Sequence, residues 1–311
     1  MTANTDRKVI LVTRKTRLEE LVSKFQTLAQ AKFYIEHMGQ DFNVYEQEHA
    51  KYLAARQLVL GAMTSLGRYQ VIDRMFLPNF VFGPQDVVIA LGQDGLVANT
   101  MKYLNGHALM GVNPDAYQYD GILLPFEAKD INTKLIVETM REQRQYQTVT
   151  MAMASLTDGQ TLYAVNDLFI GPKTHATARY EIRHGQAHET QWSSGIIVST
   201  GLGSTGWMRS IYTGAMAIAQ LQGATQPPAY QSMPWNSSHL MFAVREPFIS
   251  RASQANIVTG EVTEKEKLIL ESHMPENGII FSDGIEADFL AFNAGSVASI
   301  GVADRQGRLV V

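Results

Sequence analysis

The residue pattern of the chain changes near residue 126, and this change most constrains the fold. Before residue 126, short apolar segments alternate with longer helical ones; after it, short alternating segments follow one another with tight turns between them. Strands alternating with helices indicate a parallel sheet covered by helices, whereas many short strands in succession are typical of a β-sandwich. We therefore expect an N-terminal α/β domain with a parallel sheet and helices over 1–126 and a β-sandwich-like domain over 127–303, with a tail, 304–311, that can return to the first domain.

In the first domain, residues 8–13 and 108–112 are expected to be strands, with a further strand over 86–91. Thr16-Arg17-Leu18-Glu19 has the form of a capping box, and it predicts one helix through Met38 that stops at Gly39. A second helix is expected over 44–66 and ends at Gly67. A loop after residue 91 leads into a helix over 97–104.

In the second domain, one helix over 130–142 precedes the strands. Asp158-Gly159 and His184-Gly185 are hairpin turns that join 147–156 to 161–170 and 176–183 to 187–192. Residues 222–236, rich in Pro, Gln and Ser, are expected to be a surface loop. Further strands are expected over 195–200, 239–244, 256–262, 267–272, 279–282 and 297–303.

Composition excludes several classes of function. The formal net charge of -4 and the lack of a basic run argue against a nucleic-acid partner. No apolar run approaches the roughly 18 residues that a membrane span requires, and the polar start does not resemble a signal peptide. The absence of cysteine excludes disulfides, thiol catalysis and cysteine-bound metals. We expect a cytoplasmic protein without a membrane partner.

The segment 90–99, Ala-Leu-Gly-Gln-Asp-Gly-Leu-Val-Ala-Asn, lies between an expected strand and an expected helix. A carboxylate at Asp94, between two glycines and beside a helix N-terminus, combines a general base with backbone donors for phosphate. This is the chemistry of phosphoryl transfer to a hydroxyl. The alternative is an Asp-Gly turn without chemistry.

A second glycine-rich segment, Gly201-Leu202-Gly203-Ser204-Thr205-Gly206, has the spacing of a dinucleotide-binding loop. No Asp or Glu occurs between Glu189 and Glu246, so the ribose-binding acid that should follow about 20 residues later is missing. There is also no P-loop sequence. Backbone N–H groups and the hydroxyls of Ser204 and Thr205 can still hold a ligand.

Three other polar features occur in the second half of the chain. His184 and His188 flank a hairpin turn, which is not a metal-binding spacing, and no metal ligands are assigned. Asn166-Asp167 interrupts an apolar strand, so this pair is either a satisfied structural pair or a contact to a ligand. Asp283 follows an apolar strand and precedes Gly284.

Taken in order, these pieces resemble the NAD kinase family. The family's GGDGT motif matches residues 92–96, and its Gly-Val-Asn-Thr-Asp segment matches 111–115. Its Asn-Glu pair matches Asn166-Asp167, its second glycine loop matches 200–207, and a late Asp-Gly matches Asp283-Gly284. The resemblance extends from about residue 86 to the C-terminus.

The resemblance implies transfer of the ATP γ-phosphoryl group to the 2′-hydroxyl of the adenosine ribose of NAD, with Mg²⁺ offsetting the triphosphate charge. Asp94 would be the general base. It implies a homodimer or homotetramer, with the site between the two domains and completed by a neighbour; a methionine-rich surface (Met151, Met153, Met208, Met216, Met233, Met241) is the feature that favours assembly, against the alternative that these methionines fill the core. The nucleotide-binding residues it implies are Gly92, Gln93, Gly95, Leu96, Asn166, Asp167, Gly203, Ser204, Thr205, Gly206, Trp207 and Asp283.

The chain departs from the family pattern at positions that would face the ligand. Gln93 replaces a glycine, Leu96 replaces a threonine, and Ser194 stands where many members have an aspartate. Gly206-Trp207 replaces Ala-Tyr. Two alternatives therefore stay open: a nucleotide-binding or regulatory relative with weak or no catalysis, and a kinase of another hydroxyl acceptor.

Overall fold

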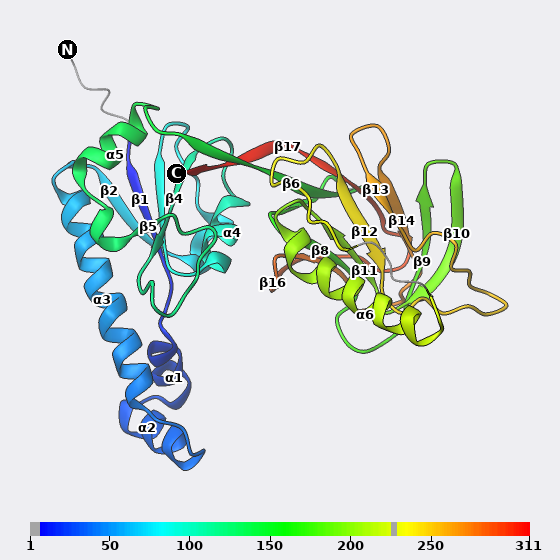
Figure 1. The fold of residues 1–311 in the computed structure, drawn as a ribbon, viewed down its shortest axis with the longest axis horizontal. Coiled ribbons are helices and arrows are strands. Elements are labelled where there is room, and N and C mark those ends of the chain that lie inside the picture. Colours follow the sequence, from blue (N-terminus) through cyan, green and yellow to red (C-terminus); the bar gives the residue numbers. More distant parts are fainter. Residues whose placement is uncertain (1–6, 225–228) are drawn as a thin grey trace. The chain divides into compact units, whose positions relative to one another are not determined.

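The computed structural model describes residues 7–224 and 229–311, and the chain forms two compact units (Figure 1). The first unit contains residues 1–147 and 308–311, and the second contains 148–307. The division follows residue 147 rather than residue 126, because the strand at 126–127 pairs with the sheet of the first unit and the next helix packs on the core of that unit.

The first unit is built on a parallel sheet with strand order β2-β1-β3-β4, as the alternation of strands and helices predicts. The other edge of β4 pairs with β5 at one end and with the last residues of β17 at the other, again in parallel. Its elements are β1 (Val9–Thr13), α1 (Arg17–Phe25), α2 (Leu28–His37), α3 (Asn43–Thr64), β2 (Tyr69–Asp73), the 3-10 helix η1 (Arg74–Asn79), β3 (Val87–Leu91), α4 (Asp94–Met101), β4 (Ala108–Asn113), β5 (Phe126–Glu127), the 3-10 helix η2 (Ala128–Asp130) and α5 (Thr133–Met140).

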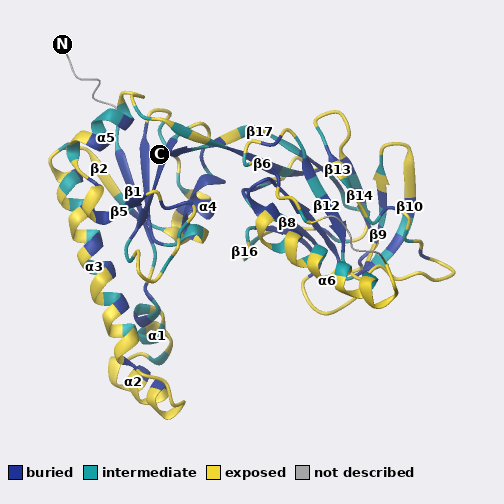
Figure 2. Ribbon diagram, viewed as in Figure 1, coloured by how far each residue is buried: buried dark blue, intermediate teal, exposed yellow. Residues whose placement is uncertain are grey.

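Every residue of β1, β3 and β4 is buried, and these strands form the dark centre of the unit in Figure 2. Tyr52, Val59 and Met63 of α3 and Ile136 of α5 join alternate strand residues in one apolar cluster. Continuous apolar strands of this kind are expected in a parallel sheet, which helices cover on both faces.

The single helix expected from Thr16 to Met38 is wrong. The Thr16–Glu19 capping box begins α1, but the helix ends at Phe25, and Gln26 adopts a left-handed conformation with φ 68°. Thr27 then caps α2, where its hydroxyl accepts the N–H of Gln30. The break lets α2 fold back on α1, and the two helices share a small apolar cluster that includes Leu18, Ala31, Ile35 and Phe42.

The second unit is a two-layer antiparallel structure, which confirms the expected β-sandwich. One layer has the order β13-β12-β11-β8-β15-β16; the other contains β10-β9-β14-β17, with β6 and β7 following β17. The main core lies between the layers. The elements are β6 (Tyr146–Leu156), β7 (Thr161–Ala164), β8 (Asp167–Pro172), β9 (Ala178–His184), β10 (Ala187–Ser193), β11 (Ile196–Ser199), the 3-10 helix η3 (Gly203–Thr205), α6 (Trp207–Leu221), β12 (Leu240–Val244), β13 (Thr259–Val262), β14 (Leu268–Ser272), β15 (Gly278–Ser282), β16 (Ile285–Ala291) and β17 (Val297–Val310).

The six-stranded layer is covered on its outer face as well. Phe169, Ile197 and Phe281 point away from the main core and form a second cluster with Met208 of α6 and with Trp207. Alternation along β8 sends Leu168 inward and Phe169 outward, as the two-residue period of a strand requires.

Several sequence-based expectations need correction in this unit. The strand expected over 161–170 is two strands in different layers, and β16 was not predicted. The six methionines do not form an apolar surface: Met151, Met208 and Met233 are buried, and the other three are half-buried. Of the expected loop 222–236, residues 225–228 lie outside the described part of the chain.

Within residues 7–224 and 229–311, no helix combines the length and the apolar character that crossing a bilayer requires.

Candidate functional site

The glycine loop of the first unit joins β3 to α4, as the sequence predicts. Asp94 is the first residue of α4, and both oxygens of its carboxylate accept backbone hydrogen bonds: Oδ2 from Ile122 at 3.1 Å and Oδ1 from Leu123 at 2.8 Å. These bonds fix the position of the carboxylate. Each carboxylate oxygen has a further lone pair, so Asp94 keeps the capacity to accept a proton or a substrate hydroxyl.

The other residues of the first glycine loop differ in how far they are buried. Leu96 is 4% exposed, and its side chain packs against Gly92. A Cβ on Gly92 would lie 2.9 Å from Cδ2 of Leu96, so a larger residue at position 92 would force the Leu96 side chain to shift. Gln93 is half-buried and Gly95 is exposed. Leucine at position 96 therefore has a packing role, and its side chain offers no hydrogen bond to a phosphate.

In the second unit, Asp283 holds the corner between β7 and β8. Its carboxylate accepts the backbone N–H groups of three consecutive residues, Val165 at 3.1 Å, Asn166 at 2.6 Å and Asp167 at 3.4 Å. Asp283 itself has a left-handed backbone with φ 54°, and its N–H donates to the carbonyl of Asp167. This cradle explains why the strand breaks at Asn166, and it gives Asp283 a structural role.

The second glycine loop packs directly on this corner. A Cβ on Gly203 would lie 2.2 Å from the carbonyl oxygen of Asn166 and 2.7 Å from Oδ1 of Asp167, so only glycine fits. Ser204 is fully buried, and its hydroxyl donates to the carbonyl of Gly201 and accepts the N–H of Met233. The Ser204 hydroxyl is thus used within the loop.

The two residues that follow Ser204, Thr205 and Gly206, are exposed, so this part of the loop remains accessible to a ligand.

Asp167 is the residue of this unit with the strongest sign of a binding role. Burial raises the pKa of its carboxyl to about 7, the charge of Asp283 adds to the rise, and a hydrogen bond with Ser199 opposes it. Its Oδ1 is buried without a hydrogen-bond partner within the described residues. Unsatisfied buried acceptors are rare, and a carboxyl that titrates near neutrality beside a glycine loop is a candidate ligand contact.

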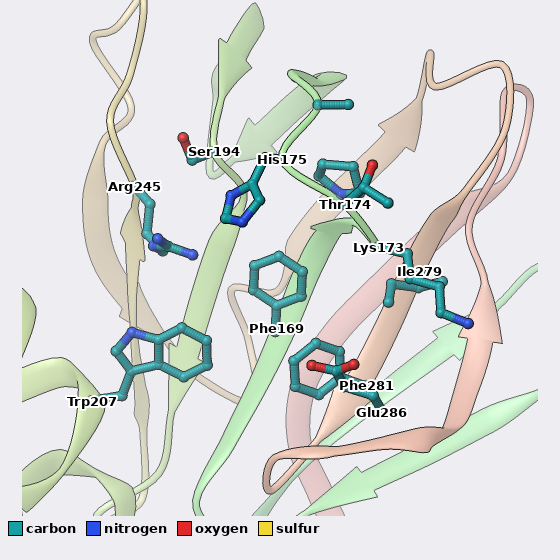
Figure 3. A pocket seen from close by; sticks show the side chains of 12 residues that line it. Phe169, Lys173, Thr174, His175, Ser194, Trp207, Arg245, Ile279, Phe281 and Glu286 are labelled. Atoms are coloured by element: carbon teal, nitrogen blue, oxygen red, sulfur yellow. The ribbon is translucent and has the colours of Figure 1, made fainter.

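A cavity of about 360 Å³ opens beside Trp207, the last residue of the predicted loop (Figure 3). Trp207 and Phe169 lie parallel, with ring centroids 6.0 Å apart and planes at 4°, and Phe281 packs on the other side of Phe169. The guanidinium of Arg245 lies over the Trp207 ring, 5.6 Å from its centroid. Lys173, His175, Ser194 and Glu286 complete the polar part of the wall.

Of these wall residues, the sequence pointed only to Trp207 and Ser194. In the sequence, the one feature that could have pointed to Arg245 is its position as a basic residue directly after the apolar strand that ends at Val244. The backbone carbonyl of Arg245 accepts the N–H of Ser194, which brings the two loops together, but this pairing joins residues far apart in the sequence.

Two solved structures are similar to almost the whole chain. A yeast NADH kinase complexed with NADH aligns over 98% of this chain and 83% of its own, with a TM-score of 0.57 and 12% identity. An NAD kinase from Archaeoglobus fulgidus in complex with ATP aligns over 97% of this chain and 93% of its own, with a TM-score of 0.51 and 15% identity. The chain has the fold of the NAD kinases. Its sequence matches no protein-family model and no curated protein.

On this NAD-kinase fold, the predicted site residues form two groups. Gly92 to Leu96 form one group in the first unit. Asn166, Asp167, Asp283 and the loop 203–207 form the other group in the second unit, where hydrogen bonds and close packing join them. The described residues contain no group of three or more acidic or histidine side chains that could hold a metal ion.

Proposed function

We propose that the protein transfers the terminal phosphoryl group of ATP to the 2′-hydroxyl of NAD or of a closely related nucleotide. The observation that carries the proposal is Asp94, a carboxylate held by two backbone N–H groups at the start of α4, directly after a glycine loop. A fixed carboxylate beside a helix N-terminus suits both parts of the reaction, because the helix end attracts phosphate and the carboxylate accepts a proton.

The proposed step balances as follows. The acceptor oxygen forms a bond to the γ-phosphorus, the bond from this phosphorus to the bridging oxygen breaks, and ADP leaves with the electron pair. The proton of the acceptor hydroxyl passes to Asp94. Phosphoryl transfer requires little covalent chemistry from the protein, so orientation of the hydroxyl by Asp94 is its main contribution.

The second unit supports a nucleotide as the acceptor. The aromatic rings of Trp207, Phe169 and Phe281 offer flat apolar faces, while Arg245 and Lys173 bring positive charge to the same cavity. A ligand that carries both a heterocyclic ring and phosphate groups satisfies both features.

Magnesium fits the proposal as a companion of the phosphates. Mg²⁺ at kinase sites is commonly held by one or two carboxylates together with substrate phosphates, and so it does not need a cage of protein ligands. When bound, it would offset the charge of the triphosphate.

The test is incubation of the purified protein with Mg-ATP and a panel of NAD, NADH and related nucleosides, followed by mass analysis of the products. The proposal expects a product heavier by one phosphoryl group and carrying it at the 2′ position. A phosphorylated product from one of the nucleosides, and from neither NAD nor NADH, would instead identify a kinase of a different acceptor. Nucleotide binding without any product would identify a non-catalytic relative.

A matched pair of variants tests the pocket. Trp207→Leu removes a cavity wall, whereas Trp192→Leu removes an indole that also lies under a guanidinium, that of Arg179, but does not line this cavity. NAD affinity should fall about tenfold in the first variant, because a stacked ring contributes about 0.5–1.5 kcal/mol beyond its buried area. It should stay unchanged in the second. Equal losses in the two variants would remove the cavity from the proposal.

A further inference from the structure

Two guanidinium groups share one carboxylate near the end of β1. Nη2 of Arg14 lies 3.5 Å from Oε1 of Glu48, and Nε of Arg17 donates to Oε2 of the same residue. Glu48 is 6% exposed and Arg14 is 9% exposed, measured on their side chains. The three side chains together carry one net positive charge, and Arg14 and Glu48 are the buried members, because the Arg17 side chain is 43% exposed.

The guanidinium of Arg14 is directed at the glycine loop. Its Nε lies 3.5 Å from the place where a side chain on Gly92 would begin. This Nε is buried and has no hydrogen-bond partner among the residues that the structure describes. A buried N–H donor without an acceptor is rare in folded proteins and requires an explanation.

Tyr52 of α3 holds Arg14 beside the loop. The Tyr52 hydroxyl accepts the backbone N–H of Arg14 at 3.1 Å and donates to the carbonyl of Leu91 at 3.3 Å. It thereby ties the residue after β1 to the last residue of β3. The guanidinium also lies over the Tyr52 ring, 5.9 Å from its centroid.

The N-terminus of α4 presents backbone donors at the same loop. Gln93, the N-cap residue, makes no side-chain capping bond, and its carbonyl accepts the N–H groups of Leu96 and Val97. The N–H groups that precede them in the first turn have no carbonyl within the helix to bond. The positive end of the helix dipole adds to their preference for an anion.

We propose that Arg14 is a positioning residue for the phosphate donor: its Nε and the first turn of α4 together bind the polyphosphate chain of a nucleoside triphosphate. This inference rests on the proposed phosphotransferase function and names the part of the chain that holds the donor. The unpaired donor, the net positive charge and the uncapped helix end all call for the same ligand, an anion with several oxygens. A guanidinium edge and backbone N–H groups are the partners that phosphate oxygens accept from most strongly.

The test compares Arg14→Gln with Arg17→Gln, using inorganic tripolyphosphate and ATP as probes in calorimetric titrations. Both variants take one guanidinium from Glu48, but Arg17 is 43% exposed and stacks on Tyr45, 4.8 Å from the ring centroid. We expect Arg14→Gln to lower the affinity for both probes at least about tenfold, which is the size expected for loss of a charge-assisted hydrogen bond. Arg17→Gln should change affinity by less than about threefold, in keeping with the small effect of exposed ion pairs.

Arg14→Lys provides a second variant in case the glutamine variant does not fold. It keeps the charge and lacks the Nε donor, so tripolyphosphate should bind it more weakly than wild type and with a similar salt dependence. NAD affinity should not change in any of the three variants. Equal loss of tripolyphosphate affinity in Arg14→Gln and Arg17→Gln, or wild-type affinity in Arg14→Lys, would overturn the inference.

The experiments can reject the role of Arg14 without rejecting the kinase function, and the reverse. Phosphorylated product with an unchanged KM for ATP in Arg14→Gln would reject the role of Arg14 and keep the kinase. Tripolyphosphate binding that depends on Arg14, without any product from the panel of acceptors, would keep the anion site and reject the kinase.

Discussion

Asp94 holds two backbone N–H groups and is the proposed general base, and one substitution tests both roles. In Asp94→Asn, the side chain keeps one oxygen, so one of the N–H groups of Ile122 and Leu123 loses its acceptor. We expect the free energy of unfolding to fall by about 0.5–1.5 kcal/mol, the net contribution of one hydrogen bond, because the N–H of Ile122 is exposed and can bond to water instead. Turnover should fall by about 10²–10⁴-fold, the contribution of a positioned general base.

Urea unfolding and single-turnover phosphorylation measure these two effects on the same protein preparation. Turnover near that of wild type would remove Asp94 from the mechanism. Unchanged stability would mean that the two backbone bonds contribute little to the fold.

Asp167 predicts a pH dependence of stability. Burial raises the pKa of this carboxyl to about 7, whereas an aspartate in an unfolded chain titrates near pH 3.9, so between about pH 4 and pH 7 the folded protein binds more protons. The free energy of unfolding therefore falls as the pH rises through this window. Asp167→Asn should flatten this dependence.

Urea midpoints between about pH 5 and pH 8 measure the effect. Asp158→Asn is the control, because hydrogen bonds from Gln160 lower the pKa of this exposed carboxyl and keep it out of the window. An Asp167→Asn variant with the wild-type slope would show that another group titrates there.

At the scale of the elements, we expect a Gly→Ala substitution to lower stability in the second glycine loop and to raise it in α6. Gly203→Ala places a methyl group 2.2 Å from a backbone carbonyl, which cannot move without disturbing the corner at Asn166. We expect a loss of stability of at least about 2 kcal/mol, within the range seen for overpacked interiors. Gly214→Ala lies within α6, where nothing approaches within 4 Å of the new methyl group. It should add about 0.5–1 kcal/mol, the difference in helix propensity.

Thermal unfolding of the two variants and of wild type measures both effects. A tolerated Gly203→Ala would mean that the loop can move away from the corner, and the close packing described above would not be essential.

The elements that the sequence predicted well are those with local signals. The Thr16–Glu19 capping box begins a helix, and the His184-Gly185 turn joins β9 to β10. Failures arose where a distant contact decides the structure. The break at Asn166 depends on the carboxylate of Asp283, 117 residues away, so no local pattern could show it. The break between α1 and α2 had a local signal, Thr27 followed by Gln30, which the apolar pattern across it obscured.

In the candidate site, too, the residues with a local sequence signal could be predicted and those that depend on distant contacts could not. The glycine loops and Asp94 have recognisable residue patterns. Arg14 could be read in the sequence only as a basic residue after a strand, since its importance depends on an unpaired Nε and on its distance from Gly92. Likewise, the resemblance implied that Leu96 binds the nucleotide, and its packing role appears only when its neighbour Gly92 is known.

At the scale of the whole molecule, assembly into a homodimer or homotetramer stays a prediction. The methionines therefore no longer support it, but large apolar side chains stay exposed in and directly after α2: Leu28, Phe33 and Met38 are between 49% and 71% exposed. A second chain can cover large apolar side chains that one short helical segment leaves exposed. Light scattering over a dilution series should give a mass of at least two chains at micromolar concentration. A monomeric mass at that concentration, with unchanged nucleotide binding, would contradict the prediction.

The path of the chain between the two units has a consequence for the order in which they are made. The second unit is inserted between residue 147 and residue 308 of the first, and Arg308 and Leu309 pair with the start of β4. The residues that pair with the start of β4 are therefore synthesised after every residue of the sandwich unit. Domains usually fold as units during synthesis. The first unit is an exception, because its parallel sheet cannot be completed at Ala108 and Leu109 until residues 308 and 309 have been made.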